Sequence, residues 1–527
     1  MNPYENTTAS QLYERLQADR QPYIDTAEQC AMLTLPAVFP PEGRRGSLPR
    51  PRNWVGARGV NHITSRILMA TFPAGSQFVR MVPNGKALKV LSEDEAVRAA
   101  VEKDLADIER EIQKHVASSQ LRVVGADVIK QLVVVGNVLT KYPKTGEPTY
   151  FTLREYVVER DRSDNLLCIV LREELTSQTI DAVTRDWITT HPDPNEFGAG
   201  AVSPAVVTVY TKVYKDGNMW KSVQEINGFA VDGTEESYTP ETMPWAALRW
   251  EREAKQAYGN SLLSQYQGTL AEIESLTKSL SDGAKIAARV VPLVNPTGYV
   301  DPRDLDEAEN GQAIAGKEGD VTFLQVQKYA DFTTAAKQLD EMTRAMSSVF
   351  LLNFARDAER VTAEEIRMFA QELETTHSGV FIRLSLEFQL PWVKGVIRRL
   401  EAEGSIGKVS NKKVADNIKP TPLTGIDALA RGQDLQKMSV VFDSAMKVIP
   451  QAEFVKRVNS GVVLSFMMTS AGLDIPGAIR TDDEVDQLDQ LAQENEQLKI
   501  MLQQATGPLA TWLTQAGNQS QPQPTNQ

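Results

Sequence analysis

The side chains of this 527-residue chain that could do chemistry are few and scattered. The four histidines stand far apart in the sequence: His62, His115, His191 and His377. None has the spacing that brings metal ligands together. No glycine-rich loop precedes the Lys-Ser or Lys-Thr pair that cradles nucleotide phosphates. The sequence therefore predicts a protein that is not an enzyme, without a metal or other cofactor. A hydrolase that uses scattered carboxylates is a weaker alternative, because no constellation of residues supports it.

Arginines are the remaining candidates, and they occur in two polar segments. The segment 353–360 carries Arg356 and Arg360 beside two acids and cannot form a buried core. Residues 331–362 contain four basic and five acidic residues, which leaves a net charge of −1. The other arginines lie in a loop that prolines and glycines interrupt: Arg44, Arg45, Arg50 and Arg52. Both segments are predicted to be exposed.

Helical patterns flank the segment 353–361. Before it, apolar residues recur at steps of three and four, which predicts a helix over 331–352. After it, Thr362 and Glu365 have the spacing of a capping box, and a helix is predicted over 362–403 with a bend near Pro391. The segment 353–361 is therefore predicted to be an exposed loop between two helices.

A third helix is predicted upstream, over 258–291. Between it and the helix 331–352, residues 292–330 are rich in proline, glycine and acids, with seven carboxylates against three bases. Five of these acids are close together: Asp301, Asp304, Asp306, Glu307 and Glu309. The pattern predicts a helical hairpin with a small, exposed, irregular module at its tip.

Residues 1–257 have a mixed pattern. A helix is predicted over 9–40, and short β-branched or aromatic runs between 148 and 230 predict an antiparallel sheet packed on helices. The two cysteines, Cys30 and Cys168, form no disulfide framework, and no run is apolar enough to span a bilayer. This part is predicted to be an α+β layer.

The carboxyl-terminal part is predicted to be helical over 404–504 and disordered over the uncharged tail 505–527. Its leucines follow a heptad pattern for barely two and a half repeats, from Leu488 to Leu502. Either a short coiled coil or a helix that packs on its own assembly fits this pattern.

Six segments, in order along the chain, resemble the portal, or head-to-tail connector, of short-tailed, podovirus-type bacteriophages. They are Trp54–Asn61, Lys130–Leu139, Tyr156–Asp161, Leu293–Gly298, the capping box at Thr362, and Thr424–Asp434. The resemblance implies a mostly α-helical subunit with an α+β wing that assembles into a ring of about twelve copies. Its implied parts are a wing (1–257), a first stem helix (258–291), a clip (292–330), a second stem helix (331–352), a tunnel loop (353–361), a long kinked wing helix (362–403), a helical crown (404–504) and a disordered tail (505–527).

The implied function is to form the DNA channel at one vertex of a phage head, for genome packaging, retention, ejection and tail attachment. The implied partners are double-stranded DNA, terminase, scaffolding protein, the major capsid protein and tail adaptor proteins, with no membrane. The implied place is the head-tail junction of the virion, after assembly in the cytoplasm of the bacterial host.

The residues themselves and the resemblance together give expected roles for individual residues, although the resemblance implies no role for the four arginines of the basic loop. Arg356 and Arg360 would contact DNA in the tunnel, or pair with nearby acids or a neighbouring subunit. Arg44, Arg45, Arg50 and Arg52 would contact DNA or another subunit at the periphery, or simply be solvated. Thr362 and Glu365 would cap a helix, and the five clip carboxylates would dock partners.

The net charge of −13 argues against a broad basic surface that grips nucleic acid. It fits a protein that DNA passes. The alternative is a cytoplasmic oligomeric scaffold or coiled-coil adaptor without DNA transit, which the leucine pattern and the acidic balance would also fit.

Overall fold

The computed structural model describes residues 2–44, 46–73, 78–93, 95–176, 179–190, 206–287, 291–309, 312–324, 329–352, 379–406 and 417–422, with 443–445, 447, 463, 490–491 and 493–501 nearer the carboxyl end. The chain divides into two compact units, Met1–Ile426 and Asp427–Gln527. Arg356, Arg360, Thr362 and Glu365 lie outside the described residues, as do the predicted tunnel loop and the tail 505–527.

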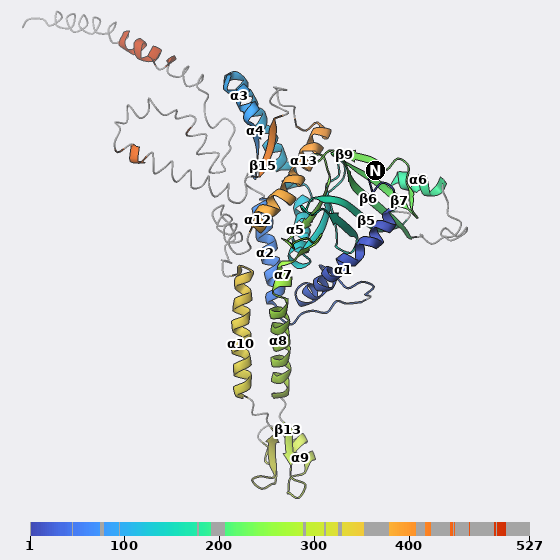
Figure 1. The fold of residues 1–527 in the computed structure, drawn as a ribbon. Coiled ribbons are helices and arrows are strands. Elements are labelled where there is room, and N and C mark those ends of the chain that lie inside the picture. Colours follow the sequence, from blue (N-terminus) through green and yellow to red (C-terminus); the bar gives the residue numbers. More distant parts are fainter. Residues whose placement is uncertain are drawn as a thin grey trace, which may run out of the picture. The chain divides into compact units, whose positions relative to one another are not determined.

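The first unit contains an antiparallel sheet in the order β4-β5-β6-β7-β8, with β9 also paired to β7 (Figure 1). Its strands are β4 (Tyr156–Arg160), β5 (Leu166–Thr176), β6 (Val206–Asp216), β7 (Met219–Ile226), β8 (Phe229–Ala230) and β9 (Glu236–Tyr238). Asp216 pairs with Met219, so a two-residue turn joins β6 to β7. The predicted antiparallel sheet in this region is confirmed.

The helix α1 (Ala9–Leu33) packs against this sheet. Its start is capped by the Thr8 hydroxyl, which accepts a hydrogen bond from the backbone N–H of Gln11 at 3.4 Å. An apolar cluster joins the two elements: Leu12, Tyr13 and Leu16 with Val157, Cys168 and Val170. The prediction of a helix over 9–40 is wrong at its end, because the helix stops at Leu33. Pro36 follows closely and disfavours helical backbone in the residue before it.

A second sheet follows the helix α5 (Leu121–Val134) and has the order β10-β2-β3. Its strands are β2 (Asn137–Lys141), β3 (Thr149–Phe151) and β10 (Trp245–Arg249). Gly136 makes the turn from α5 into β2 with a φ of +86°, and a Cβ there would lie 2.6 Å from the backbone nitrogen of Ser261. Glycine is therefore required at this position. The smaller elements near this sheet are α6 (Ala182–Thr190), β11 (Glu251–Arg252) and β12 (Gly259–Asn260).

The main core includes apolar residues of the helix α2 (Val55–Thr71) and of a helical run made of α12 (Val380–Arg383), η2 (Leu384–Gln389) and α13 (Leu390–Glu403), together with residues of α5 and β2. The rings of Phe388 and Trp392 pack edge to face with centroids 4.7 Å apart. The segment η2 is π-helical, and the Leu390 N–H donates to the Ser385 carbonyl. This wider turn comes just before Pro391, which has no N–H for an α-helical bond.

Strand β1 (Val79–Pro83) pairs antiparallel with β15 (Ile418–Pro422), near the helices α3 (Gly85–Glu93) and α4 (Glu95–Ser118). The prediction of a helical segment over 404–504 is therefore wrong for Ile418–Pro422. Pro420 and Pro422 are incompatible with a helix interior, whereas an edge strand tolerates them.

In the second unit, residues 490–491 and 493–501 are helical where they are described. Leu491 and Leu498 are exposed in the single chain. Leu488 and Leu502 lie outside the described residues, so both interpretations of the heptad pattern stay open. Among the described residues of the whole chain, no helix is long and apolar enough to cross a membrane. Cys30 and Cys168 are free thiols and are buried.

Candidate functional site: the helical hairpin and its tip

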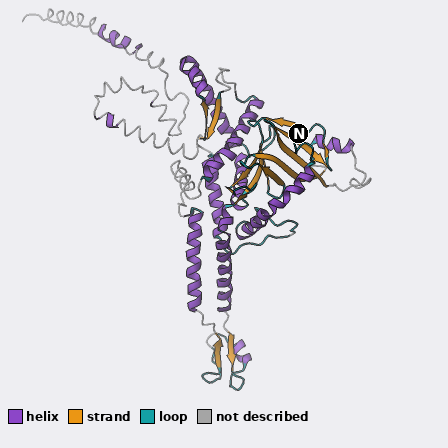
Figure 2. Ribbon diagram, viewed as in Figure 1, coloured by secondary structure: helices purple, strands orange, loops and turns teal. Residues whose placement is uncertain are grey.

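Two long helices of the first unit form a hairpin that extends away from the rest of that unit (Figure 2). They are α8 (Gln267–Ala287), which follows the short helix α7 (Leu262–Gln265), and α10 (Tyr329–Val349). A Cβ at Gly283 would lie 2.4 Å from the Phe332 ring, so the missing side chain is what lets the two helices approach here. Nearer the base, the Gln338 amide donates to the Glu272 carboxylate at 3.0 Å. The two helices therefore contact each other near both ends.

Burial differs along the hairpin. At its base, Leu270 and Ile273 of α8 and Met346 of α10 are buried in the main core. Toward the tip, Phe332 is only half-buried and Ile286 is 57% exposed. The base is thus anchored in the first unit, while the distal half keeps apolar surface that the single chain does not cover.

The end of α10 is braced against α2. Leu351, two residues after the helix, has a left-handed φ of +55°, which non-glycine residues seldom adopt. His62 on α2 has a hydrogen bond to the backbone of Leu351. Burial, together with the charge of Arg66, lowers the pKa of His62, although this hydrogen bond opposes the shift. His62 is therefore a structural residue at the point where the hairpin returns to the core.

The tip of the hairpin is a small module with its own hydrogen-bond network. Strands β13 (Val291–Val294) and β14 (Val321–Leu324) pair antiparallel, and α9 (Pro302–Glu307) lies between them in the sequence. The Asp320 carboxylate accepts the backbone N–H groups of Tyr299 at 3.1 Å and Lys317 at 2.9 Å. Its side chain is buried, with the residue 8% exposed. Asp320 thus holds together the connections on either side of α9.

The acidic residues at the tip separate into two kinds. Asp301 caps α9 by accepting from the Arg303 N–H at 2.9 Å. The five acids predicted as a docking surface are all exposed: Asp301, Asp304, Asp306, Glu307 and Glu309. The sequence pattern places Asp320 only among the seven carboxylates of 292–330 and indicates no buried role for it. No local signal distinguishes it, because its partners are backbone groups 21 and 3 residues away.

The exposed surface of the tip also has apolar residues. Tyr299 is 72% exposed and Leu293 is 48% exposed. The Lys317 ammonium lies 4.8 Å from the centre of the Tyr299 ring, which is a cation–π arrangement. The tip therefore offers a mixed surface with aromatic, aliphatic and acidic groups.

The basic loop is fixed to the hairpin at one end. The backbone N–H of Arg52 donates to both oxygens of Glu274 on α8, at 2.9 and 3.0 Å, and the Asn53 N–H donates to the same carboxylate at 3.0 Å. Although burial opposes the charge, these hydrogen bonds lower the pKa of Glu274. The Arg52 guanidinium pairs with Asp282 of α8 at 3.2 Å. Arg52 therefore has partners within its own chain.

The other predicted residues of this loop are placed differently. Arg44 is exposed and donates to the Ser47 carbonyl at 3.2 Å, and Arg50 is exposed. Arg45 lies outside the described residues. Of the three arginines in this loop that the structure describes, Arg52 pairs with a carboxylate and Arg44 donates to a backbone carbonyl.

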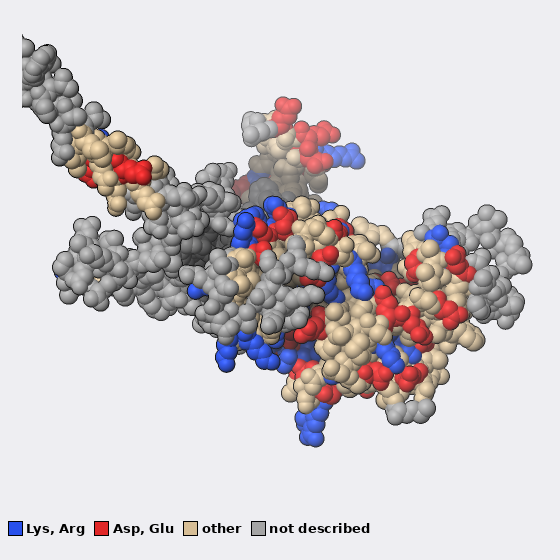
Figure 3. Space-filling model, turned by 90° about the horizontal axis from the view of Figure 1, so that it is seen from above, with Lys and Arg blue, Asp and Glu red and all other residues tan. Residues whose placement is uncertain are grey.

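The electrostatic character of the described surface is mixed. On the face shown in Figure 3, acidic and basic side chains are interspersed among the described residues. Among these residues, no group of three or more His, Cys, Asp or Glu side chains could hold a metal ion. The described part of the chain thus has a hairpin with a buried base, an exposed tip and no broad basic surface on the face shown in Figure 3.

Comparison with known proteins identifies the class. Residues 6–476 match the family described as "Bacteriophage head to tail connecting protein". The chain therefore belongs to this family, and its function is that of a structural portal subunit that connects the head and tail of a phage.

Individual relatives give the same result. The chain is 33% identical over 503 residues to the portal protein of Escherichia phage T7, covering 93% of this chain and 91% of that protein. It is 34% identical over 487 residues to the portal protein of Enterobacteria phage T3, covering 90% of this chain and 89% of that protein. The match to a solved structure titled "Neck of empty GTA particle computed with C6 symmetry" covers 79% of this chain and 90% of that chain, at 13% identity and a TM-score of 0.37.

Proposed function

We propose that about twelve copies of this chain form a closed ring at one vertex of a phage head and that double-stranded DNA passes through its centre. The observation that carries the proposal is the hairpin, whose base is buried and whose distal half keeps Ile286 and Phe332 partly uncovered. Neighbouring hairpins in a ring would bury this surface, since removing apolar area from water is favourable. One chain cannot enclose a duplex, whereas a ring can.

The loop 353–361 is proposed to face the channel, with Arg356 and Arg360 contacting phosphates only in passing. The support is the near balance of charge over 331–362, at four bases against five acids. Each phosphate that a basic side chain neutralises adds about 0.9 to the steepness with which the logarithm of the binding constant falls with the logarithm of the salt concentration. Many such contacts at once would hold DNA in place. A channel works better with weak contacts.

The tip, within the predicted range 292–330, is proposed to dock terminase during packaging and tail adaptor proteins afterwards. The exposed side chains of Tyr299, Leu293 and the acids of α9 support this proposal. The wing would face scaffolding protein and the major capsid protein during assembly in the host cytoplasm. No step in this function requires a cofactor.

The test of ring formation is the mass of the purified particle, together with electron micrographs. We expect a closed ring with a central hole. A dimer or trimer would instead favour an oligomeric adaptor without DNA transit and would contradict the portal assembly.

The test of the channel is the double variant Arg356→Gln/Arg360→Gln, with Lys86→Gln/Lys144→Gln as a charge-matched control on exposed side chains elsewhere. We expect ring yield close to that of the unmodified chain, with altered packaging or retention of DNA only in the first variant. Fewer rings with normal DNA in each assembled head would show that Arg356 and Arg360 hold subunits together.

The test of the tip is Tyr299→Ser, with Lys144→Gln as a distant control on the exposed surface. We expect rings of normal yield that bind terminase or tail adaptors more weakly. Normal attachment by this variant would place the docking surface elsewhere.

A further inference from the structure

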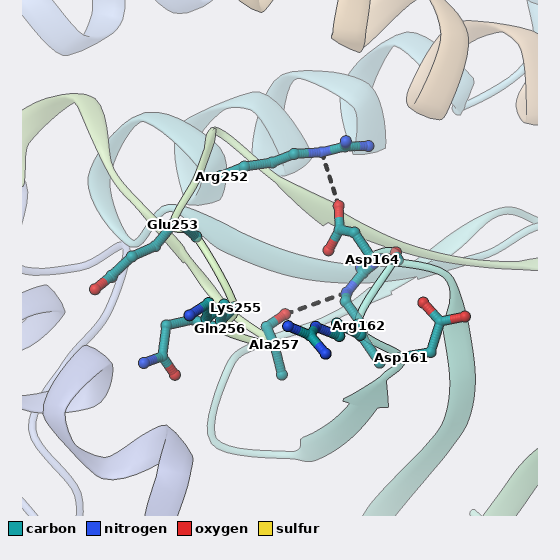
Figure 4. Close-up of a pocket in the computed structure, with 10 residues that line it drawn as sticks. Asp161, Arg162, Asp164, Arg252, Glu253, Lys255, Gln256 and Ala257 are labelled. Carbon is teal, nitrogen blue, oxygen red and sulfur yellow. Dashed lines mark hydrogen bonds and ion pairs between the residues drawn. The ribbon is translucent and has the colours of Figure 1, made fainter.

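A pocket of about 190 Å³ lies in the first unit, away from the hairpin tip. One side is the turn between β4 and β5, with Asp161, Arg162 and Asp164, and the other is the loop 252–257 between β11 and β12. Figure 4 shows side chains of both segments around it, with Arg252 reaching Asp164. The portal function described above does not use this pocket.

Buried arginines hold both sides of the pocket in place. Arg249 is 3% exposed, and its guanidinium bridges the two segments by pairing with Asp164 at 2.6 Å and donating to the Gln256 carbonyl at 3.4 Å. Arg160 donates to the Ala257 carbonyl at 3.2 Å and to the Asp164 carbonyl at 3.3 Å. The pocket is therefore built before any ligand arrives.

Two residues that line the pocket have unusual backbone conformations. Asp164 has a φ of +71° and Lys255 a φ of +66°. The left-handed backbone conformation is unfavourable for a non-glycine residue such as lysine, and it persists only when surrounding contacts impose it. Here the contacts are those of Arg249 and Arg160, which bind the carbonyl groups of the two residues after Lys255.

The carboxylates that line the pocket are already engaged. Asp161 accepts the backbone and side-chain N–H groups of Asn165 at 2.7 and 2.9 Å. Glu253 accepts the Tyr23 hydroxyl at 2.7 Å. Asp164 pairs with Arg249 and Arg252, and although burial opposes its charge, these pairs lower its pKa.

The pocket also has basic side chains that pair with none of these acids. Within the described part of the chain, Arg162 and Lys255 have no ion-pair partner. Arg160 has a lowered pKa of about 10, because it is buried and lies near the charge of Arg249, and it remains protonated at neutral pH. Arg160 donates to the carbonyl groups of Ala257, Asp164 and Ala247, so its guanidinium is held in place beside the pocket.

We propose that this pocket binds a phosphate group, held by Arg162 and Lys255 with Arg160 behind them. Guanidinium and ammonium donors on fixed backbone suit a compact oxyanion, because charge-assisted hydrogen bonds to phosphate are short and strong. The phosphate comes either from solution or from the backbone of nucleic acid, and the experiment separates these two sources.

The experiment is calorimetric titration of the full-length assembled protein with inorganic phosphate in a low-salt, phosphate-free buffer. We expect saturable binding that becomes at least tenfold weaker in Arg162→Gln/Lys255→Asn. Asparagine is chosen at 255 because it tolerates left-handed backbone. The control is Lys86→Gln/Lys144→Gln, which removes the same charge from exposed lysines elsewhere and should leave binding unchanged. Arg162→Lys keeps the charge and should give an intermediate affinity.

A second titration adds phosphate in the presence of a short DNA duplex. Competition that the Arg162→Gln/Lys255→Asn variant abolishes assigns the phosphate to nucleic acid, while binding of phosphate without competition assigns it to solution. The proposal is overturned if phosphate does not bind, or if the control variant weakens binding as much as the pocket variant. Ring yield is measured in parallel for each variant. A variant that forms rings normally but binds phosphate weakly separates the pocket proposal from the proposed ring assembly.

Discussion

The six-stranded sheet with α1 and the tip of the hairpin are both antiparallel β-structures accompanied by a helix, yet different forces hold them. In the sheet, Lys212 and Glu225 form an ion pair at 2.6 Å with side chains 5% and 6% exposed. Glu225 also accepts the N–H of Ala9 at 2.5 Å, and Lys212 donates to the Thr7 carbonyl at 2.9 Å. These polar contacts lie beside an extended apolar cluster.

The tip has no comparable core among its described residues. Its strands β13 and β14 span four residues each, no residue of α9 is buried, and Asp320 is its central brace. Segments with few buried apolar contacts open at lower free energy than core elements. We therefore expect the sheet to be the more rigid of the two regions and the tip to open more readily.

The largest effect is expected from Glu225→Gln in the sheet. This change leaves the buried Lys212 ammonium without a charged partner, and breaking such a pair from one side costs about 3–5 kcal/mol. The free energy of unfolding, measured by urea titration of the purified chain, should fall accordingly. The control is Lys221→Gln, which removes an exposed pair with Asp216 and should cost much less, because solvent screens exposed ion pairs. Similar losses in both variants would contradict the view of the sheet as a frame held by its buried pair.

A smaller and local effect is expected from Asp320→Asn in the tip. The neutral amide is a weaker acceptor for the N–H groups of Tyr299 and Lys317, and we expect a local loss of about 1–3 kcal/mol. Hydrogen exchange should become faster over 295–324 and stay unchanged in β5 and β6. Glu307→Gln, an exposed neighbour, is the control. Equal acceleration in the sheet would show that the two regions unfold together.

The junction beyond the hairpin provides a third test. Replacing Thr362 with Ala should destabilise the predicted helix start by about 0.5–2 kcal/mol, because a backbone N–H loses its acceptor. Faster hydrogen exchange is expected over 353–361, with Thr424→Ala as a distant control. Exchange that does not change within error would count against the predicted capping box at Thr362 and Glu365.

The smallest effect is expected from pH. Burial lowers the pKa of His62, so the folded chain binds fewer protons there than the unfolded chain. Stability from this residue is therefore present above its unfolded pKa of about 6.5 and is lost as the pH falls below that value. Thermal unfolding between pH 7.5 and 5.5 should show a smaller decrease in His62→Gln than in the unmodified chain. An identical decrease in both would mean that other groups govern this range.

Several features of the fold could be predicted because they depend on local patterns. The short β-branched runs predicted the antiparallel sheet, and the exposed positions of the acids around α9 follow from a composition that a core cannot hold. In the hairpin region, alternating three- and four-residue spacing predicted helices, and the structure has α8 and α10 there. The predicted range 258–291 is too long for one helix, because Gly259–Asn260 is strand β12, the short helix α7 is separate, and α8 ends at Ala287. The six segments typical of portal proteins also pointed to the family that residues 6–476 match.

Other features were decided only by tertiary structure. Asn84 and Asn417, which are 333 residues apart, bond through their side chains at 2.9 Å beside the pairing of β1 with β15. The Glu274 carboxylate accepts the backbone N–H groups of Arg52 and Asn53, just before α2 begins. The Asp320 carboxylate is buried and accepts the N–H of Tyr299, whereas the nearby acids of α9 are exposed. Periodicity reports which face of an element is apolar, because that depends on neighbours three or four residues away. It carries no information about which distant backbone groups a carboxylate will meet, because folding alone brings those groups within hydrogen-bond distance.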